Sequence, residues 1–278
     1  MTGRPAPIPA SLRQLLPDPS FRPQPGWGQN FLLDQRIAQR MVDALEPAPG
    51  QRVLEIGPGT GSLTRLLLAT QAAVAAIEID RRLEAALGPL TQQGLRLTWG
   101  DALALDWQEV LGGAVEEALI VSNVPYAISG PLLVRIVKSR PRCALVMVQA
   151  EVADRLLAPV GDSRRGSLTL VREAHAHAEL LFRVKGAAFW PAPEVTSAVL
   201  RLWPRAAAVE QGAEWIWTNL FHYRRKTVRR SLQEAFSLSP KEALAILAEA
   251  GLDSRLRPQE LPLGAFESLA RLLPRRED

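Results

Sequence analysis

Residues 53–62 decide the fold, and they read Val-Leu-Glu-Ile-Gly-Pro-Gly-Thr-Gly-Ser. The pattern predicts a buried strand, then a tight glycine-dense turn, then a helix from about Gly61. Glycine permits a positive φ and lets a ligand approach the backbone closely. A dinucleotide fingerprint needs G-x-G-x-x-G, whereas the spacing here is G-x-G-x-G, with Ser62 in place of the third glycine. The turn therefore argues against NAD and against a pyrophosphate on the helix N-terminus. Taken alone, it could also be a tight connection without a ligand.

Short apolar runs alternate with helical patterns around this turn. Such alternation is typical of βαβ units, which build a parallel sheet. Two later runs, residues 178–184 and 196–203, are expected to form a closing antiparallel pair. We therefore expect an α/β, Rossmann-like sheet that is mostly parallel with an antiparallel closing strand. The earlier expected strands are residues 52–56, 74–79, 95–99, 119–121 and 143–149.

The chain is expected to have three parts. Residues 1–25 contain seven prolines and should form a flexible arm, because Pro removes backbone donors and blocks helices. Residues 26–205 hold the α/β domain. Residues 206–278 show helical periodicity with turns at Pro240, Pro258 and Pro262, which predicts a small all-helical domain.

The bulk composition excludes some classes of protein. The chain has 278 residues, 47% of them hydrophobic, so it can bury a large core. The formal net charge of +4 matters for an anionic partner only if the positive charges cluster. The single Cys143 cannot form an internal disulfide, which fits a reducing compartment. No signal-peptide-like region and no run of roughly 20 apolar residues is present, so we expect a cytoplasmic protein.

Two acidic residues stand at the ends of the next two expected strands. Glu78 lies at the end of the strand at 74–79, and Asp101 follows the strand at 95–99. Because ligands of open α/β sheets bind beyond the carboxyl ends of the strands, both should lie beside the glycine turn. S-adenosyl-L-methionine needs an acid for its ribose hydroxyls, which Glu78 can supply, and an acceptor for its adenine amine, which Asp101 can supply. The pattern therefore predicts this cofactor and a methyltransferase sheet.

The residues after the fourth strand, 123–126, read Asn-Val-Pro-Tyr and are candidates for catalysis. An adenine amine is a poor nucleophile, and hydrogen bonds to neutral acceptors favour the pyramidal geometry that attacks a methyl sulfonium. The side-chain oxygen of Asn123 and the backbone carbonyl of Val124 or Pro125 can accept those bonds. Pro125 fixes the turn, and Tyr126 can stack on the base. Alignment would then do most of the catalysis without a separate general base. In isolation, the same residues could be only a turn that ends a strand.

Five positive charges lie within seven residues that contain no acid. We expect them on one helix, with like charges stacked at i,i+4, an arrangement that destabilises a helix and suggests an RNA phosphate partner. The alternative is a solvated helix face. His175 and His177 lack a third ligand, so no metal site is expected. The basic residues are Arg224, Arg225, Lys226, Arg229 and Arg230.

Five segments, in this order, resemble the ribosomal RNA adenine N6-dimethyltransferases, most of all the bacterial small-subunit type whose loss gives kasugamycin resistance. The resemblance covers nearly everything from Gly28 to the C-terminus, and the ordered combination is more specific than any single segment. Val124 stands where Leu or Ile is usual, and His222 and Tyr223 vary the basic motif, which bears on substrate affinity rather than chemistry. The segments are residues 29–32, 55–61, 123–126, 189–197 and 221–226.

The resemblance implies roles for individual residues. Asn123, Pro125, Tyr126 and Phe189 would form the catalytic site, with the rings of Tyr126 and Phe189 on either side of the flipped adenine. The resemblance also implies six residues that contact the cofactor, and we add Gly59 of the glycine turn to them. This set is Asn30, Leu32, Gly57, Glu78, Asp101 and Asn123.

The implied reaction is the transfer of methyl groups to the N6 atoms of two adjacent adenosines near the 3′ end of 16S rRNA. Each adenosine would receive two methyl groups, and the enzyme would act as a monomer on the small ribosomal subunit during its biogenesis. One alternative is the related large-subunit methyltransferase of the macrolide-resistance type. Another is an assembly factor whose main role is not catalytic.

Overall fold

The computed structural model describes residues 7–16, 18–206 and 209–273. The chain divides into two compact units. The first contains Met1–Ala153 and Ala178–Pro204, and the second contains Asp154–His177 and Arg205–Asp278. The domain boundaries expected from the sequence stay a prediction, but these units place Asp154–His177 with the C-terminal helices rather than with the sheet.

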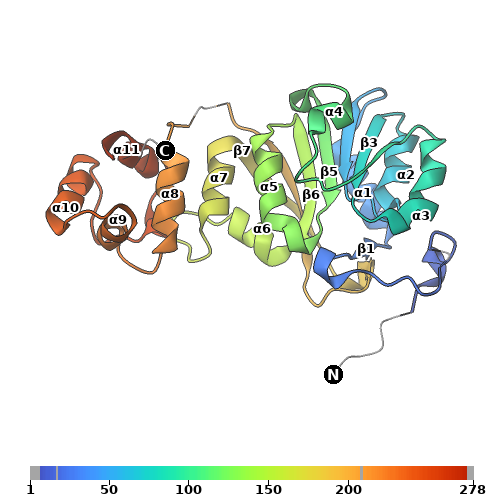
Figure 1. Ribbon diagram of the computed structural model, residues 1–278, viewed down its shortest axis with the longest axis horizontal. Helices are drawn as coiled ribbons and strands as arrows, with labels where there is room; N and C mark the ends of the chain where they lie inside the picture. Colours follow the sequence, from blue (N-terminus) through green and yellow to red (C-terminus); the bar gives the residue numbers. More distant parts are fainter. Residues whose placement is uncertain (1–6, 17, 207–208, 274–278) are drawn as a thin grey trace. The chain divides into compact units, whose positions relative to one another are not determined.

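The first unit is built on a seven-stranded sheet with the strand order β4-β3-β2-β5-β6-β9-β7 (Figure 1). The pairs that join β4 to β6 are parallel, and β9 runs antiparallel to β6. This arrangement confirms the expected fold class. The strands are β2 (Arg52–Ile56), β3 (Ala73–Glu78), β4 (Arg96–Trp99), β5 (Leu119–Asn123), β6 (Cys143–Gln149), β7 (Ala176–Val184) and β9 (Ser197–Pro204).

Burial explains why the central strands read as continuous apolar runs. Strands covered on both faces cannot alternate between apolar and polar residues. In β2, Val53 and Leu54 are fully buried and Ile56 is nearly so. β7, at the edge of the sheet, is mostly exposed or half-buried. The helices of this part of the chain are α1 (Gln35–Leu45), α2 (Ser62–Ala69), α3 (Glu84–Thr91), α4 (Trp107–Leu111), α5 (Ser129–Lys138) and α6 (Ala150–Leu156).

The N-terminal residues pack differently from the flexible arm expected over residues 1–25. Leu12, Leu16 and Phe21 are buried in the core of the first unit. The Phe21 ring centroid lies 6.0 Å from that of Phe31 and 6.4 Å from that of Trp190. The folded part therefore begins before residue 26, while residues 1–6 and 17 lie outside the described residues. A small antiparallel pair, β1 (Phe31–Leu32) with β8 (Phe189–Trp190), continues this packing and was not expected.

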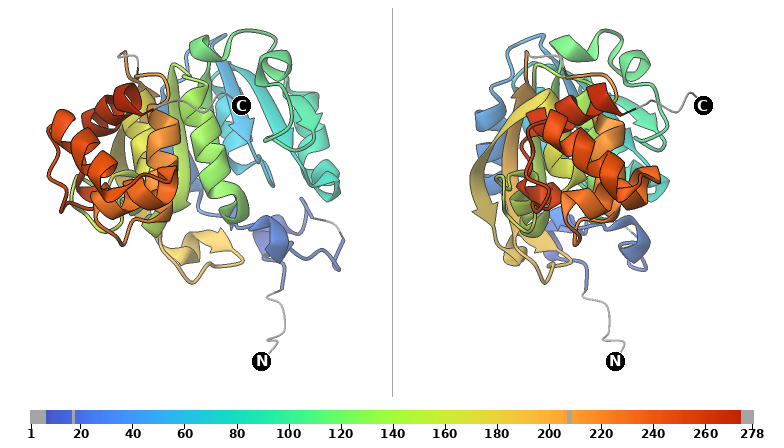
Figure 2. Two further views of the ribbon diagram at one scale, coloured as in Figure 1. Left: turned by 60° about the vertical axis from the view of Figure 1, so that its left-hand side comes forward. Right: turned by 90° about the vertical axis from the view of Figure 1, so that its left-hand side faces the viewer.

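The second unit is helical, as Figure 2 shows for its C-terminal helices, and its core contains Trp217 and Phe266. Their ring centroids lie 6.4 Å apart in an edge-on arrangement. Local signals define the helix starts: Ser239 caps α10 and forms a capping box with Glu242. The helices are α7 (Ser167–His175), α8 (Ala213–His222), α9 (Val228–Phe236), α10 (Pro240–Glu249) and α11 (Leu263–Leu272). No helix within the described residues is long and apolar enough to span a bilayer.

Candidate active site

A cavity lies at the carboxyl ends of β2, β3 and β5 in the first unit. In a parallel sheet these ends meet at one edge, so residues far apart in the sequence converge there. All seven residues expected to contact a cofactor line this cavity. The lining comprises residues 26–32, 55–60, 62–63, 77–79, 100–102 and 123–128.

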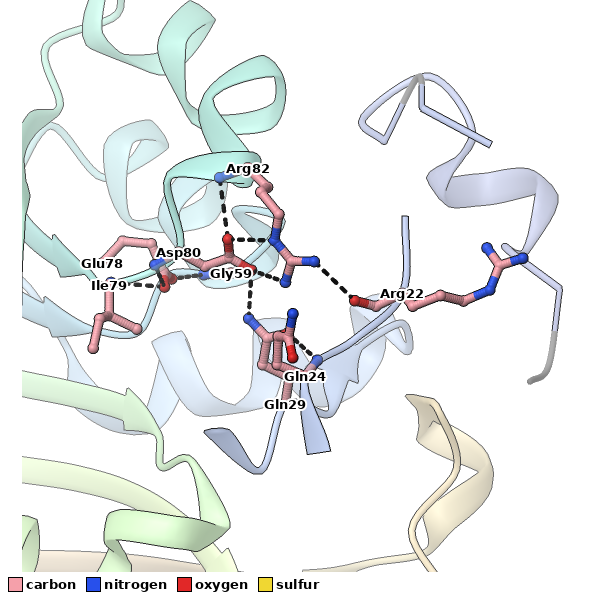
Figure 3. Close-up of polar contacts among 8 residues, drawn as sticks. All are labelled: Arg22, Gln24, Gln29, Gly59, Glu78, Ile79, Asp80 and Arg82. Carbon is pink, nitrogen blue, oxygen red and sulfur yellow. Dashed lines mark hydrogen bonds and ion pairs between the residues drawn. The ribbon is translucent and has the colours of Figure 1, made fainter. Parts of the chain in front are cut away.

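Glu78, the last residue of β3, is held by three backbone N–H groups. Its Oε1 accepts from Ile79 and Asp80 at 2.9 Å each, and its Oε2 accepts from Gly59 at 3.0 Å (Figure 3). Burial raises the pKa of this carboxyl, and the three backbone hydrogen bonds oppose that rise. Gly59 has a φ of 59°, and a Cβ there would lie 3.1 Å from the Phe31 ring. The glycine therefore allows the backbone to reach the carboxylate.

Three of the other expected cofactor residues lie after β4, in the N-terminal segment and in the turn after β2. Asp101 follows β4 and is exposed, and its Oδ1 accepts from the Leu103 N–H at 2.8 Å. The carbonyl of Leu32 accepts from the Ser62 hydroxyl at 2.7 Å, which ties the N-terminal segment to the start of α2. The Gly57 N–H donates to the carbonyl of Ile77 at 2.9 Å, which joins the turn to β3.

Asn123, the last residue of β5, has its side-chain amide oriented by the N-terminal segment. Its Nδ2 donates to the backbone carbonyl of Asn30 at 2.8 Å. Within the described residues no donor is bonded to Oδ1, so the oxygen remains able to accept from a ligand. This is the orientation that acceptance from an amine requires.

Tyr126 begins a 3₁₀ turn, Tyr126–Ile128, directly after Pro125. Its hydroxyl lies 2.8 Å from the Ser197 hydroxyl at the start of β9, and burial raises its pKa. Gly28 packs against the same turn: a Cβ at Gly28 would lie 2.7 Å from the Tyr126 backbone nitrogen. Sequence reasoning assigned no role to Gly28 or Ser197. Ser197 lies in the resembling segment 189–197, and Gly28 directly precedes the segment 29–32.

Phe189, expected to contact the target base, does not line the cavity. It is 3% exposed, pairs with Leu32 between β8 and β1, and is not among the lining residues. Its expected contact with the target base therefore stays a prediction that would require its ring to move out of the core.

Comparison with known proteins shows the family of the chain. A family model described as ribosomal RNA adenine dimethylase matches residues 20–271. The chain belongs to the ribosomal RNA adenine dimethylase family. The protein is thus an S-adenosyl-L-methionine-dependent enzyme that methylates adenine in ribosomal RNA, which confirms the expected reaction class and cofactor.

Individual members and solved structures agree over most of the chain. Ribosomal RNA small subunit methyltransferase A of Moorella thermoacetica is 37% identical over 267 residues, which cover 90% of this chain and 92% of that protein. A dimethyladenosine transferase from Plasmodium falciparum has a TM-score of 0.72 at 25% identity and covers 86% of this chain and 95% of that chain. The 23S rRNA methyltransferase ErmE has a TM-score of 0.64 at 25% identity, covering 87% and 98%.

The lining residues fit the cofactor of this family. Glu78 Oε2 accepts one backbone hydrogen bond and keeps a lone pair for a ribose hydroxyl, because each carboxylate oxygen can accept more than one hydrogen bond. The Asp101 Oδ2 has no donor within the described residues and can accept from an adenine amine. The apolar side chain of Ile79, 46% exposed, lies between these two acids in the sequence and also lines the cavity.

Glu55, in β2, is a lining residue to which sequence reasoning gave no role. It is 1% exposed, and burial raises its pKa to about 8, with the nearby charge of Glu78 adding to the rise. Its Oε2 has no hydrogen-bond partner in the part of the chain that the structure describes. A buried carboxyl oxygen without a hydrogen-bond partner is costly, and a cationic ligand would favour the charged form of Glu55. The ammonium and sulfonium groups of S-adenosyl-L-methionine are such cations.

The five basic residues lie in the second unit but not on one helix. α8 ends at His222 and α9 begins at Val228, because the Thr227 side chain caps α9 through the Arg230 N–H. Arg224, Arg225 and Lys226 therefore occupy the connecting turn, and the expected i,i+4 stacking is wrong. Arg224 donates to the Ser163 carbonyl, and Lys226 pairs with Glu234 at 2.6 Å. Neither Arg225 nor Arg229 has an ion pair within the described residues.

Proposed function

We propose that the chain dimethylates the N6 atoms of two adjacent adenosines near the 3′ end of small-subunit ribosomal RNA. One observation carries the proposal: the oriented amide of Asn123 lines the same cavity as the buried acid Glu78. The target RNA is proposed on the strength of relatives such as the Moorella protein, which is named for the small subunit. We also propose that the enzyme is a cytoplasmic monomer and acts during small-subunit biogenesis.

The cofactor supplies a methyl group on a sulfonium, and the chain's own residues prepare the amine that receives it. Asn123 Oδ1 accepts one N–H of the target amine. The second acceptor is the Val124 carbonyl, because the Pro125 carbonyl already accepts from Ile128 and Ser129. The two acceptors would thereby direct the amine lone pair at the methyl group that the cofactor supplies, and the amine proton would pass to water after the transfer. Tyr126, anchored through Ser197, stacks on the base.

The basic residues would hold the RNA through its phosphates. Arg225 and Arg229 have no ion pair within the described residues, so phosphate binding breaks no ion pair of theirs. Arg224 and Lys226 already have protein partners and would exchange them for phosphate. Phosphate contacts hold and orient the RNA without reading its sequence.

The likeness to ErmE keeps a large-subunit target as the second candidate. The deciding experiment offers labelled S-adenosyl-L-methionine with undermethylated small subunits and, in parallel, with large subunits. Nucleoside analysis and mass mapping of the RNA then locate the label. We expect N6,N6-dimethyladenosine at two adjacent positions near the 3′ end of the small-subunit RNA. Label in large-subunit RNA would overturn the proposal, and normal subunit binding without methylation would favour an assembly factor.

A further inference from the structure

The segment from Gln24 to Leu32, called the strap below, connects two sides of the cavity. On the side of β5, the Asn30 carbonyl accepts from the Asn123 amide, and Gly28 lies against the Tyr126 backbone. Gly28 can occupy this position because its φ of 62° and its missing Cβ avoid a clash. Residues 26–32 of the strap line the cavity directly. The strap therefore forms a wall shared by the cofactor region and the residues that would hold the target base.

On the side of β3, the strap is bound by Asp80. Gln29 Nε2 donates to Asp80 Oδ2 at 2.8 Å, across 51 positions of sequence (Figure 3). Arg82 binds the same carboxylate twice, with Nε 2.8 Å from Oδ1 and Nη2 2.6 Å from Oδ2. Arg82 also donates to the Arg22 carbonyl at 3.1 Å and lies 4.8 Å from the Phe21 ring. Asp80 and Arg82 thus hold the N-terminal segment at two places.

The Asp-x-Arg pattern occurs four times in this chain, so the Asp80–Arg82 pair can be compared with three others. The other three aspartates have side chains that are 18–42% exposed, whereas that of Asp80 is 1% exposed. Within the described residues, Asp80 is the member of this group that also accepts from a side chain far away in the sequence. The three other pairs are Asp34–Arg36, Asp162–Arg164 and Asp253–Arg255. Burial and the bond to Gln29 therefore distinguish this pair from a local turn motif.

We infer that Asp80 is a positioning residue that latches the strap over the cavity and thereby sets how tightly and how long the cofactor is held. Asp80 does not line the cavity; its side chain reaches the cavity wall through Gln29, and its charge also acts on the neighbouring Glu78, whose pKa it raises. Both polar atoms of the Gln29 amide form hydrogen bonds. Its Nε2 donates to Asp80, and its Oε1 accepts from the Gln24 N–H at 2.8 Å. The next residue, Asn30, orients the Asn123 amide. The inference rests on the cofactor site of the proposed function.

The latch should be present at neutral pH. Burial opposes ionisation of Asp80, but the hydrogen bonds from Arg82 and Gln29 outweigh it and hold its pKa below the usual 3.8. The carboxylate is then charged at every pH at which the enzyme would be assayed. Charge-assisted bonds of this kind are roughly twice as strong as neutral ones. Replacing the charge by an amide of the same shape is therefore an informative change.

The test compares Asp80→Asn with the matched control Asp253→Asn, which removes the same charge from an exposed pair in the second unit. Calorimetry gives the Kd for S-adenosylhomocysteine, and stopped-flow displacement gives its dissociation rate. We expect Asp80→Asn to raise Kd about tenfold, mostly through faster dissociation, while the control leaves both unchanged. These measurements need no RNA. If the wild type fails to bind, the cofactor site itself is refuted; if both variants bind like wild type, only the latch is.

A double-mutant cycle separates positioning from general destabilisation. Gln29→Ala removes the bond to the strap by itself. If Asp80 acts through Gln29, adding Asp80→Asn to Gln29→Ala should change Kd by less than about twofold. A full tenfold effect in that background would show that Asp80 acts by another route, through Glu78 or through the fold, and would overturn the inference. Should Asp80→Asn fail to fold, Arg82→Gln, at a 39% exposed side chain, tests the same latch with the same expected direction.

Discussion

The cofactor-free protein should become less stable as the pH rises towards 8, and Glu55→Gln should remove this pH dependence. The Glu55 carboxyl is 1% exposed, and burial raises its pKa from 4.5 to about 8. A carboxyl whose pKa is higher in the folded than in the unfolded protein keeps its proton up to a higher pH in the folded state. Its contribution to the free energy of unfolding is therefore complete below about pH 4.5 and is lost as the pH rises towards 8.

The size of this effect follows from proton linkage. Between the two pKa values the folded state binds up to one more proton, so the slope reaches about 1.4 kcal/mol per pH unit. Relative to Glu55→Gln, the wild type should lose a few kcal/mol of stability across this window. Gln has nearly the shape of Glu and stays neutral, so the difference between the two proteins isolates the titration of one carboxyl.

Urea unfolding of both proteins, at one-unit steps from about pH 5 to about pH 8, measures the difference directly. Parallel stability curves would refute the reasoning, because they would show that Glu55 is already charged and paired in the folded state.

A second measurement uses the cofactor, whose positive charge should lower the pKa of a nearby carboxyl. Calorimetry in two buffers should then detect more protons released near neutral pH by the wild type than by Glu55→Gln. Equal release would show that Glu55 does not face that charge.

Three other substitutions test the remaining parts of the site. Glu78→Ala should weaken binding of S-adenosyl-L-methionine by about 1.5–3 kcal/mol in calorimetry, since the ribose hydroxyls lose a charged acceptor. Asn123→Ala should lower single-turnover methylation by about 10²–10³ while RNA affinity hardly changes, because the amide matters most as the amine pyramidalises. Replacing Arg225 and Arg229 together by Ala should weaken binding to small subunits and reduce its salt slope by about 2, as two phosphate contacts are lost.

Each of these has a result that contradicts it. Unchanged cofactor affinity in Glu78→Ala would remove the ribose assignment. Equal losses of methylation and RNA binding in Asn123→Ala would make that residue a structural turn. An unchanged salt slope in the double arginine variant would leave the turn before α9 as a solvated surface.

The sequence by itself determined the fold class and the converging strand ends. The glycine turn after β2, Glu78 and Asn123 can be assigned to one site from the order of the strands along the chain, because strands of a parallel sheet end at the same edge. Composition and resemblance added the substrate class. The inference of the fold class succeeded because it depends on short-range patterns, namely strand length, helical period and turn residues, that a few neighbouring positions encode.

Only the tertiary structure decided what depends on packing between distant residues. The basic residues read as one helix, but Thr227 caps a new helix inside the run, and the prolines of the N-terminus concealed that Leu12 and Phe21 are buried in the core. Gln29 meets Asp80 across 51 positions, and no local pattern marks that contact. The same Asp-x-Arg pattern is an exposed turn in one place and a buried anchor in another. Burial, which the folded chain alone creates, makes the difference.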